Sequence, residues 1–224
     1  MEKKIAENFL LLALHPEKAR YKIGSQHLSA GLIGAILFDL TLDKKLSIEG
    51  RFLKPLVHRV KAEDAHGMIL KKILERKKPR KIKNWVSRLN TKSRKYRFMI
   101  LKEMERKKLV NVERKKFLFI PYKVARLKDE KSRKKLLKDL RSLILDKKAL
   151  GDETLALLSL VYACRGHKIL ANNKEENKKI KAQLKEIISS SAISSEVDKV
   201  IREMQAAVVL AVTTAVVASS AASN

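Results

Sequence analysis

Glycine, proline and cysteine are scarce in this sequence, which has seven glycines, four prolines and one cysteine among 224 residues. Turn-rich all-β folds use glycine and proline freely, so their scarcity favours a chain built of long helices. The single cysteine, Cys164, excludes an internal disulfide and is typical of a protein in a reducing compartment. Aromatic residues make up only 5% of the chain, which argues against a surface that stacks nucleic-acid bases.

Motifs of catalysis and metal binding are also missing. The sequence has no HExxH, CxxC, P-loop, GxGxxG or GxSxG pattern. Cys164 lies in the apolar segment LVYAC, which favours a buried, inert thiol over a nucleophile. The histidines are scattered without metal-ligand spacing, and we interpret them as surface or capping residues: His15, His27, His58, His66 and His167. We therefore expect no enzymatic activity, no cofactor and no bound metal.

Long apolar runs are absent as well. A helix that crosses a bilayer needs about 20 apolar residues. The N-terminal apolar run is short and has no small-residue cleavage site, so it predicts a first amphipathic helix and not a signal peptide. The apolar run 206–218 is too short to span a membrane, and we expect it to form a helix buried in the core.

Positive charge is what the sequence has in excess. Lys and Arg number 51 against 24 Asp and Glu, a net charge of +27, and residues 71–150 carry about +23 of it. Apolar residues recur through this basic block, so it is folded and presents a basic face. An excess of this size indicates a polyanionic partner, either nucleic acid or an anionic membrane surface.

The apolar periodicity predicts a mainly α protein. Helices are expected over 3–15, 25–43, 62–77, 81–89, 92–107, 129–145, 153–164, 173–189 and 195–219. Gly31 and Gly34 would be costly inside the second helix unless they let another helix pack closely. No linker or repeat divides the chain, so we expect one domain over 1–224: a helical bundle with two small β-hairpins and a buried apolar C-terminal helix.

The two hairpins are predicted from short apolar segments. Leu46–Leu53 alternates around Glu49-Gly50. Leu109–Val112 and Phe117–Ile120 are separated by the polar residues 113–116, which we expect to form the second turn. Phe117, Leu118 and Phe119 then have two interpretations, both open at this point: an apolar anchor in a membrane interface, or a strand that packs on the core.

A pair of arginines is the best candidate for a phosphate site. Arg94 and Arg97 are three residues apart, so they share one face of the helix expected at 92–107. Each guanidinium can hold a phosphate through two hydrogen bonds. Lys92 and Lys95 are candidates for flanking contacts. The residues alone also allow these arginines to be ordinary surface residues of a basic helix.

Several segments, taken in order, resemble a known family. They are ENFLLLAL, SAGLIGAILFDLTLDKKLSIE, the pair Asn84-Trp85, KEMERKKLVNVERKKFLFI, LILDKKAL and LALLSLVYA. Their order and spacing, from about Glu7 to Ala218, are similar to those of the Golgi phosphoprotein 3 family. Because the similarity starts so near Met1, we expect a short bacterial homologue that lacks the N-terminal Arg cluster with which eukaryotic members meet the coat.

The resemblance implies a mostly helical domain that binds phosphatidylinositol 4-phosphate on Golgi membranes. Eukaryotic members also hold the cytoplasmic tails of glycosyltransferases. The family's lipid pocket uses a loop Trp, an Arg in the Gly-rich helix, and an Arg-x-x-Arg pair. Arg94 and Arg97 match that pair, whereas Gly24 and Ile33 stand at the Trp and helix-Arg positions, so the sequence leaves the headgroup open.

Together these observations predict a cytoplasmic protein that associates peripherally with the cytoplasmic face of a membrane. The expected partner is an anionic phospholipid, phosphoinositide-like or other, with the cytoplasmic tails of membrane enzymes as further candidates. We expect a monomer at low salt, since its like charges repel, and weak self-association on membranes. The alternative is nucleic-acid binding through 71–150, which we find less favoured because aromatics are few and no helix-turn-helix or zinc knuckle is visible.

Overall fold

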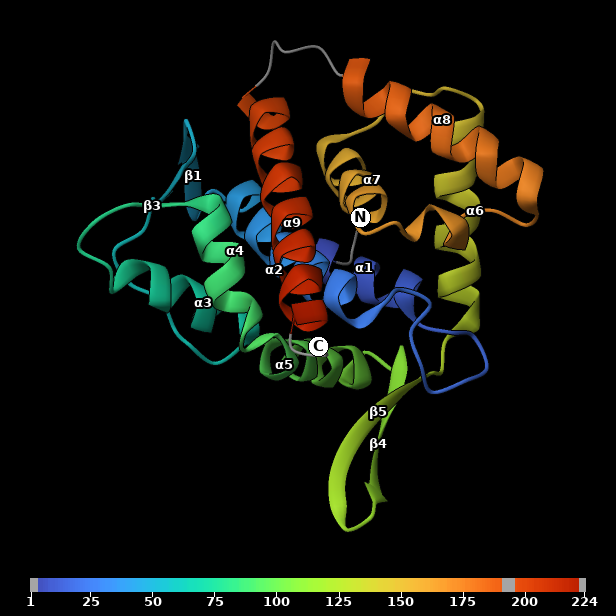
Figure 1. Ribbon diagram of the computed structural model, residues 1–224, viewed down its shortest axis with the longest axis horizontal. Coiled ribbons are helices and arrows are strands. Elements are labelled where there is room, and N and C mark those ends of the chain that lie inside the picture. Colours follow the sequence, from blue (N-terminus) through green and yellow to red (C-terminus); the bar gives the residue numbers. More distant parts are fainter. Residues whose placement is uncertain (1–3, 191–195, 222–224) are drawn as a thin grey trace.

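Helices make up most of the chain, as the apolar periodicity predicts. The computed structural model describes residues 4–190 and 196–221 (Figure 1). The helices are α1 (Ile5–Ala13), α2 (Ser25–Leu42), α3 (Ala65–Leu74), α4 (Ile82–Asn90), α5 (Ser93–Arg106), α6 (Glu130–Leu145), α7 (Asp152–Ala163), α8 (Lys174–Ser190) and α9 (Glu196–Ala221), with a 3₁₀ turn at Gly166–Ile169. The predicted mainly α fold with small β elements is confirmed.

Helix α2 is the central element, and α1, α7 and α9 all pack against it. Its residues from Ala30 to Leu40 are all buried. A Cβ atom on Gly31 would lie 2.4 Å from Phe9 Cζ and 2.5 Å from Cys164 Sγ, too close for any larger residue. The predicted close packing of helices at this glycine is confirmed.

The N-terminus of α1 is held by the buried carboxylate of Asp39, which is itself bonded by His66. The Ile5 and Ala6 backbone N–H groups donate to the Asp39 carboxylate at 2.7 and 3.1 Å, and Asp39 also bonds His66 Nε2 at 2.9 Å. A carboxylate at a helix N-terminus satisfies free N–H groups and interacts well with the helix dipole. His66 and His167 are both buried, so their interpretation as surface or capping residues is wrong.

The C-terminus of α1 is closed by a buried arginine. Arg133 Nε donates to the Leu11 carbonyl and a terminal guanidinium nitrogen donates to the Leu12 carbonyl, both at 3.2 Å. The other two carbonyls of the last turn accept from the backbone N–H groups of Leu14 and Lys22. All four carbonyls that a helix end leaves free therefore have partners.

Replacing Arg133 with Met should lower the free energy of unfolding by about 2–6 kcal/mol, because two buried carbonyls each lose a partner worth about 1–3 kcal/mol. Urea unfolding measures this change. Lys134→Met is the control: Lys134 is exposed and forms a surface ion pair with Glu130, so its loss should cost less than about 1 kcal/mol. Equal effects of the two substitutions would show that Arg133 does not hold α1.

The first predicted hairpin is present and gains a third strand. β1 (Leu46–Glu49) pairs antiparallel with β2 (Phe52–Pro55), and β3 (Arg80–Lys81) adds to the other edge of β2. Gly50 in the turn has φ +57°, a left-handed conformation that glycine adopts freely. The third strand follows α3 and had no signal in the sequence, since it is only two residues long.

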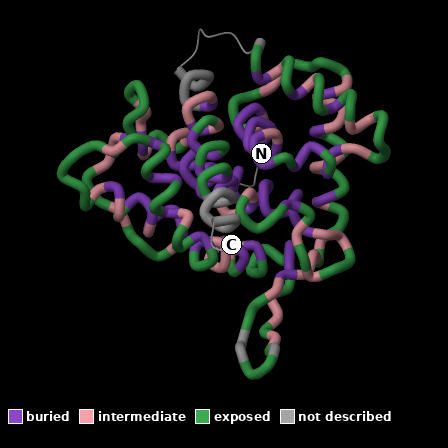
Figure 2. The backbone as a smooth tube through the Cα atoms, in the orientation of Figure 1, coloured by how far each residue is buried: buried purple, intermediate pink, exposed green. Residues whose placement is uncertain are grey.

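The second hairpin is longer than predicted and turns elsewhere. β4 (Val110–Phe117) and β5 (Ile120–Leu127) pair in register from Val110 with Leu127 to Phe117 with Ile120. The turn is therefore Leu118-Phe119, and the predicted turn at 113–116 is wrong: these residues lie within β4. Figure 1 shows this hairpin projecting from the body beside α5, and Figure 2 shows that the turn at its tip is exposed.

Helix α9 is buried on one face only. Val208 and Val212 are buried, whereas Val209 and Leu210 on the other side are each 42% exposed. The expectation that the run 206–218 is buried thus holds for half of the helix, and the side chains of 215–218 lie outside the described residues. Within the described chain, no helix combines the length and the apolar character needed to cross a bilayer.

Candidate anion-binding site

A cleft of about 610 Å³ lies between α5, the β4–β5 hairpin and the loop that follows α1. Its lining combines cations, aromatic rings and aliphatic side chains: Ala19, Tyr21, Arg94, Lys95, Arg97, Phe98, Leu101, Val112, Tyr122, Lys123, Val124 and Ala125. The cleft therefore brings together three segments that are far apart in the sequence.

Hydrogen bonds hold the walls of this cleft in place. Tyr21 forms an antiparallel bridge with Leu14, at the end of α1, which fixes the loop beside the helix. The Val112 backbone N–H donates to Glu105 Oε1 at 2.6 Å, which ties β4 to α5. The loop and the hairpin base are thus fixed to the helices and are not free ends.

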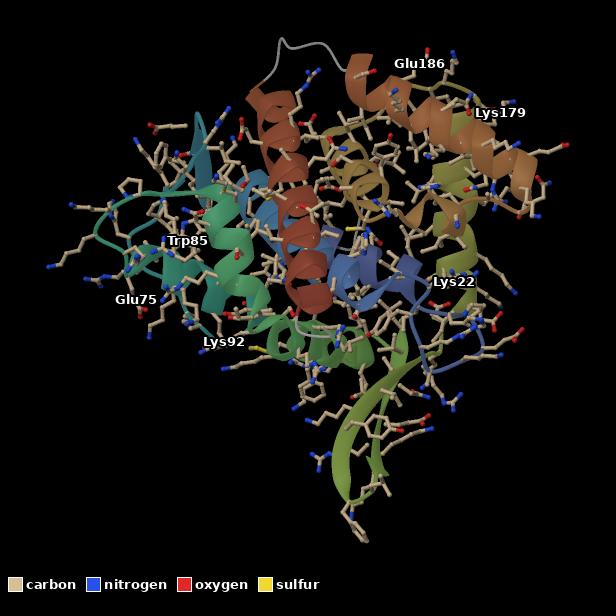
Figure 3. The ribbon with its side chains drawn as sticks, in the orientation of Figure 1. Lys22, Glu75, Trp85, Lys92, Lys179 and Glu186 are labelled. Atoms are coloured by element: carbon tan, nitrogen blue, oxygen red, sulfur yellow. The ribbon has the colours of Figure 1, made fainter. Side chains whose placement is uncertain are left out.

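The predicted arginine pair lies in this cleft. Arg94, Lys95 and Arg97 all line it, whereas Lys92 is not among its lining residues. Lys92 precedes the first turn of α5 and is exposed; Figure 3 shows it at the junction of α4 and α5. The expected spatial proximity of Arg94 and Arg97 is confirmed, and Lys92 is the flanking candidate that lies outside.

An aromatic ring from the loop supports Arg97. The Arg97 guanidinium carbon lies 5.3 Å from the centre of the Tyr21 ring, within the range of a cation–π interaction. Burial raises the pKa of Tyr21, and the nearby Arg97 offsets this only in part. The phenol therefore keeps its proton at neutral pH and can donate a hydrogen bond to an anion.

Lys123 adds a fourth cation from the hairpin. Its Nζ lies 3.5 Å from the centre of the Phe98 ring, and Lys102 Nζ lies 5.2 Å from the same centre. The ring of Phe98 thus holds an ammonium group of β5 against α5. The sequence has no signal for Lys123, Phe98 and Tyr21 as site residues, because only the fold brings a loop, a helix and a strand together here.

Among the residues that the structure describes, the cations of the cleft have no counter-charge. Its lining, within residues 4–190 and 196–221, contains no aspartate or glutamate. In the part of the chain that the structure describes, no carboxylate lies within ion-pair distance of Arg94, Lys95, Arg97 or Lys123. Neighbouring like charges repel one another, and an anion bound between them relieves that repulsion.

The two positions that depart from the family's pattern lie outside the cleft lining. Ile33 is fully buried in α2, and Gly24 is the exposed residue just before the first residue of α2. Neither can contribute a side chain to an anion. The aromatic residue that this loop does contribute is Tyr21, three residues before Gly24.

The tip of the hairpin is apolar and open to solvent. Leu118 is 76% exposed and Phe119 is 95% exposed. Both have positive φ, +44° and +69°, where bulky side chains are strained. The interpretation of Leu118 and Phe119 as core residues is therefore wrong, while the side chain of Phe117 lies outside the described residues.

Other reactive groups lie away from this cleft. Cys164 is buried and its thiol donates to the His27 carbonyl, and burial raises its pKa to about 12. The expectation of an inert, buried thiol is confirmed. Among the described residues, no three His, Cys, Asp or Glu side chains are arranged to hold a metal ion.

The model of one protein family, Golgi phosphoprotein 3 (GPP34), matches residues 5–204 of this chain. The chain belongs to the Golgi phosphoprotein 3 family. The matched range contains the cleft, the hairpin and the helices from α1 to α8, so the predicted resemblance is confirmed over most of the chain. No curated protein matches it.

Proposed function

We propose that this Golgi phosphoprotein 3 family member binds anionic phospholipid peripherally, with the lipid phosphate held in the cleft by Arg94 and Arg97. The observation that carries the proposal is a cleft whose described lining has four cations and no carboxylate, at the base of a hairpin with an exposed apolar tip. The family relationship supports a role in lipid binding. The proposed role is binding without catalysis, at the cytoplasmic face of a membrane.

The distance from the cleft to the tip suits a bilayer. Phe119, at the tip, precedes the lining residue Tyr122 by three residues. A strand rises about 3.3 Å per residue, so the tip reaches roughly 10 Å past Tyr122. The polar layer on each side of a bilayer is about 5–8 Å thick, since about 30 Å of a total of about 40–45 Å is hydrocarbon. The cleft can therefore hold a phosphate while the tip enters the apolar region.

The rest of the basic block supports the first approach to the membrane. Each Lys or Arg near an anionic surface contributes on the order of 1 kcal/mol, and this attraction falls within a Debye length. Two exposed cations of β4 lie on this side of the hairpin: Arg114 is opposite the lining residue Lys123, and Lys116 is one residue pair nearer the tip than Tyr122. They would meet the headgroup layer when the tip is inserted.

Vesicle co-sedimentation tests this proposal. The protein should sediment with phosphatidylcholine vesicles that contain an anionic lipid and stay in the supernatant with pure phosphatidylcholine. Binding should weaken as salt rises, because the long-range part is screened. A DNA gel shift on the same preparation tests the alternative: tight binding to DNA without binding to anionic vesicles would contradict the proposal. Trp85 and Tyr96 are buried and so are not available to stack on bases.

A further inference from the structure

The side chains that line the cleft can donate hydrogen bonds but can accept very few. Arginine and lysine are donors only, and the cleft has two of each. The remaining lining residues are aliphatic or aromatic, and only Tyr21 and Tyr122 have an oxygen on the side chain. No Asp, Glu, Asn, Gln, Ser or Thr is among the described lining residues.

This composition is a poor match for a polyol headgroup. The hydroxyl groups of an inositol or sugar ring must each donate a hydrogen bond as well as accept one. A ring placed among Arg94, Arg97 and Lys123 would find acceptors on few side chains, and each buried hydroxyl without a partner costs about 1–3 kcal/mol. Inositol recognition therefore has little support among these side chains.

A bare phosphomonoester fits the same surface well. Its oxygens are acceptors and it carries a charge of about −1.5 to −2 at neutral pH, as a phosphorylated side chain does. The donor-only groups of the cleft match that chemistry, with guanidinium forks suited to phosphate oxygens. Leu101, Val112 and Val124 offer an aliphatic wall beside the cations, against which an apolar body can lie.

We infer that the cleft selects a phosphomonoester carried directly on an apolar body, as in phosphatidic acid, over a phosphate displayed on a polyol ring. This inference rests on the proposed function and names the ligand class of the same site. The strands of the hairpin connect the aliphatic wall of the cleft to the apolar tip at Leu118 and Phe119.

Binding is compared on phosphatidylcholine vesicles that contain phosphatidic acid, phosphatidylinositol 4-phosphate or phosphatidylserine, at mole fractions adjusted to equal surface potential. We expect the full chain to bind phosphatidic acid about tenfold more tightly than either other lipid, which corresponds to one hydrogen-bonding difference of about 1.4 kcal/mol. Tighter binding to phosphatidylinositol 4-phosphate would overturn the inference and leave the proposed function standing. Equal binding to all three would overturn the cleft as a specific site, and no binding would overturn both.

A variant and a soluble competitor sharpen the test. Val124→Thr adds an acceptor to the half-buried wall without changing its shape, and it should narrow the preference for phosphatidic acid over phosphatidylinositol 4-phosphate by about twofold or more. Val209→Thr on α9 is the matched control and should leave the ratio unchanged. Glycerol 3-phosphate should displace the protein from vesicles only at concentrations far above that of the lipid. Displacement at similar concentrations would show that the apolar wall adds nothing, and would contradict the inference.

Discussion

Replacing Leu118 with Asn and Phe119 with Gly should stabilise the hairpin and, at the same time, release the protein from membranes. The two residues form a two-residue turn with positive φ at both positions. Asn-Gly is the favoured pair for such a turn, and a strained non-glycine residue costs on the order of 1–3 kcal/mol. Amide hydrogen exchange should therefore slow in both strands of the hairpin.

Membrane binding should change in the opposite direction. Leu118 and Phe119 are 76% and 95% exposed, so nearly their whole side chains would be transferred from water on insertion. Burial of one such side chain contributes about 1.5–3 kcal/mol, and loss of both should weaken vesicle partitioning roughly a hundredfold. A residue pair selected only for folding would not show opposite effects on stability and binding.

Leu56→Asn provides the control for this experiment. Leu56 is 54% exposed in the loop after β2, away from the β4–β5 hairpin, and its replacement should leave vesicle binding unchanged. If the Leu118 and Phe119 double variant binds vesicles as well as the wild type, the tip is not an anchor. Faster amide exchange in the hairpin of that variant would contradict the assigned turn.

The helices could be predicted closely because their signals are local. Apolar periodicity marks each buried face, and Gly31 in α2 indicates close packing that depends on its missing side chain. The second hairpin could not be placed in the same way. It projects from the body with both faces largely in water, so its strands lack apolar alternation, and the apolar pair Leu118-Phe119 lies in the turn where polar residues are usual.

The groups that hold α1 in place could not be read from the sequence. Asp39, His66 and Arg133 come from three different helices and are buried: Asp39 and Arg133 bond backbone groups of α1, and His66 bonds Asp39. A charged residue in a sequence suggests an exposed one, because burial of a charge is costly without a partner. Only the folded structure shows that free backbone groups at the two ends of α1 are the partners of the buried Asp39 and Arg133 side chains.

The candidate site could be predicted only in part, because some of its residues are brought together by tertiary packing alone. Arg94 and Arg97 are close in sequence, so helical geometry alone places them on one face. Tyr21 and Lys123 belong to a loop and a strand whose positions depend on tertiary packing. Ile33 stands at the position of a family arginine, but its side chain is buried in the core. A matching position in the sequence therefore does not place it in the cleft.

Loss of the arginine pair should have the largest effect on lipid binding. Replacing Arg94 and Arg97 with Gln removes the two guanidinium groups, and charge-assisted hydrogen bonds contribute about 1.5–3 kcal/mol each. Vesicle affinity should fall by a hundredfold or more, since about 3 kcal/mol corresponds to that factor. Replacing both with Lys keeps the charge but removes the forked geometry, so it should recover only part of the affinity.

We expect binding to be concentrated in the cleft and not spread over a basic surface. The most direct measurement is the vesicle partition coefficient of the Arg94→Gln, Arg97→Gln variant against that of Lys181→Gln, Lys185→Gln, on the anionic lipid that the wild type prefers. Lys181 and Lys185 are exposed on α8 and lie outside the basic block, so their loss should cost no more than about 1 kcal/mol each. A loss for the arginine variant several times greater than for the lysine variant is the predicted result, with unchanged thermal unfolding in both. Equal losses would show that the protein is a non-specific polycation without a binding site.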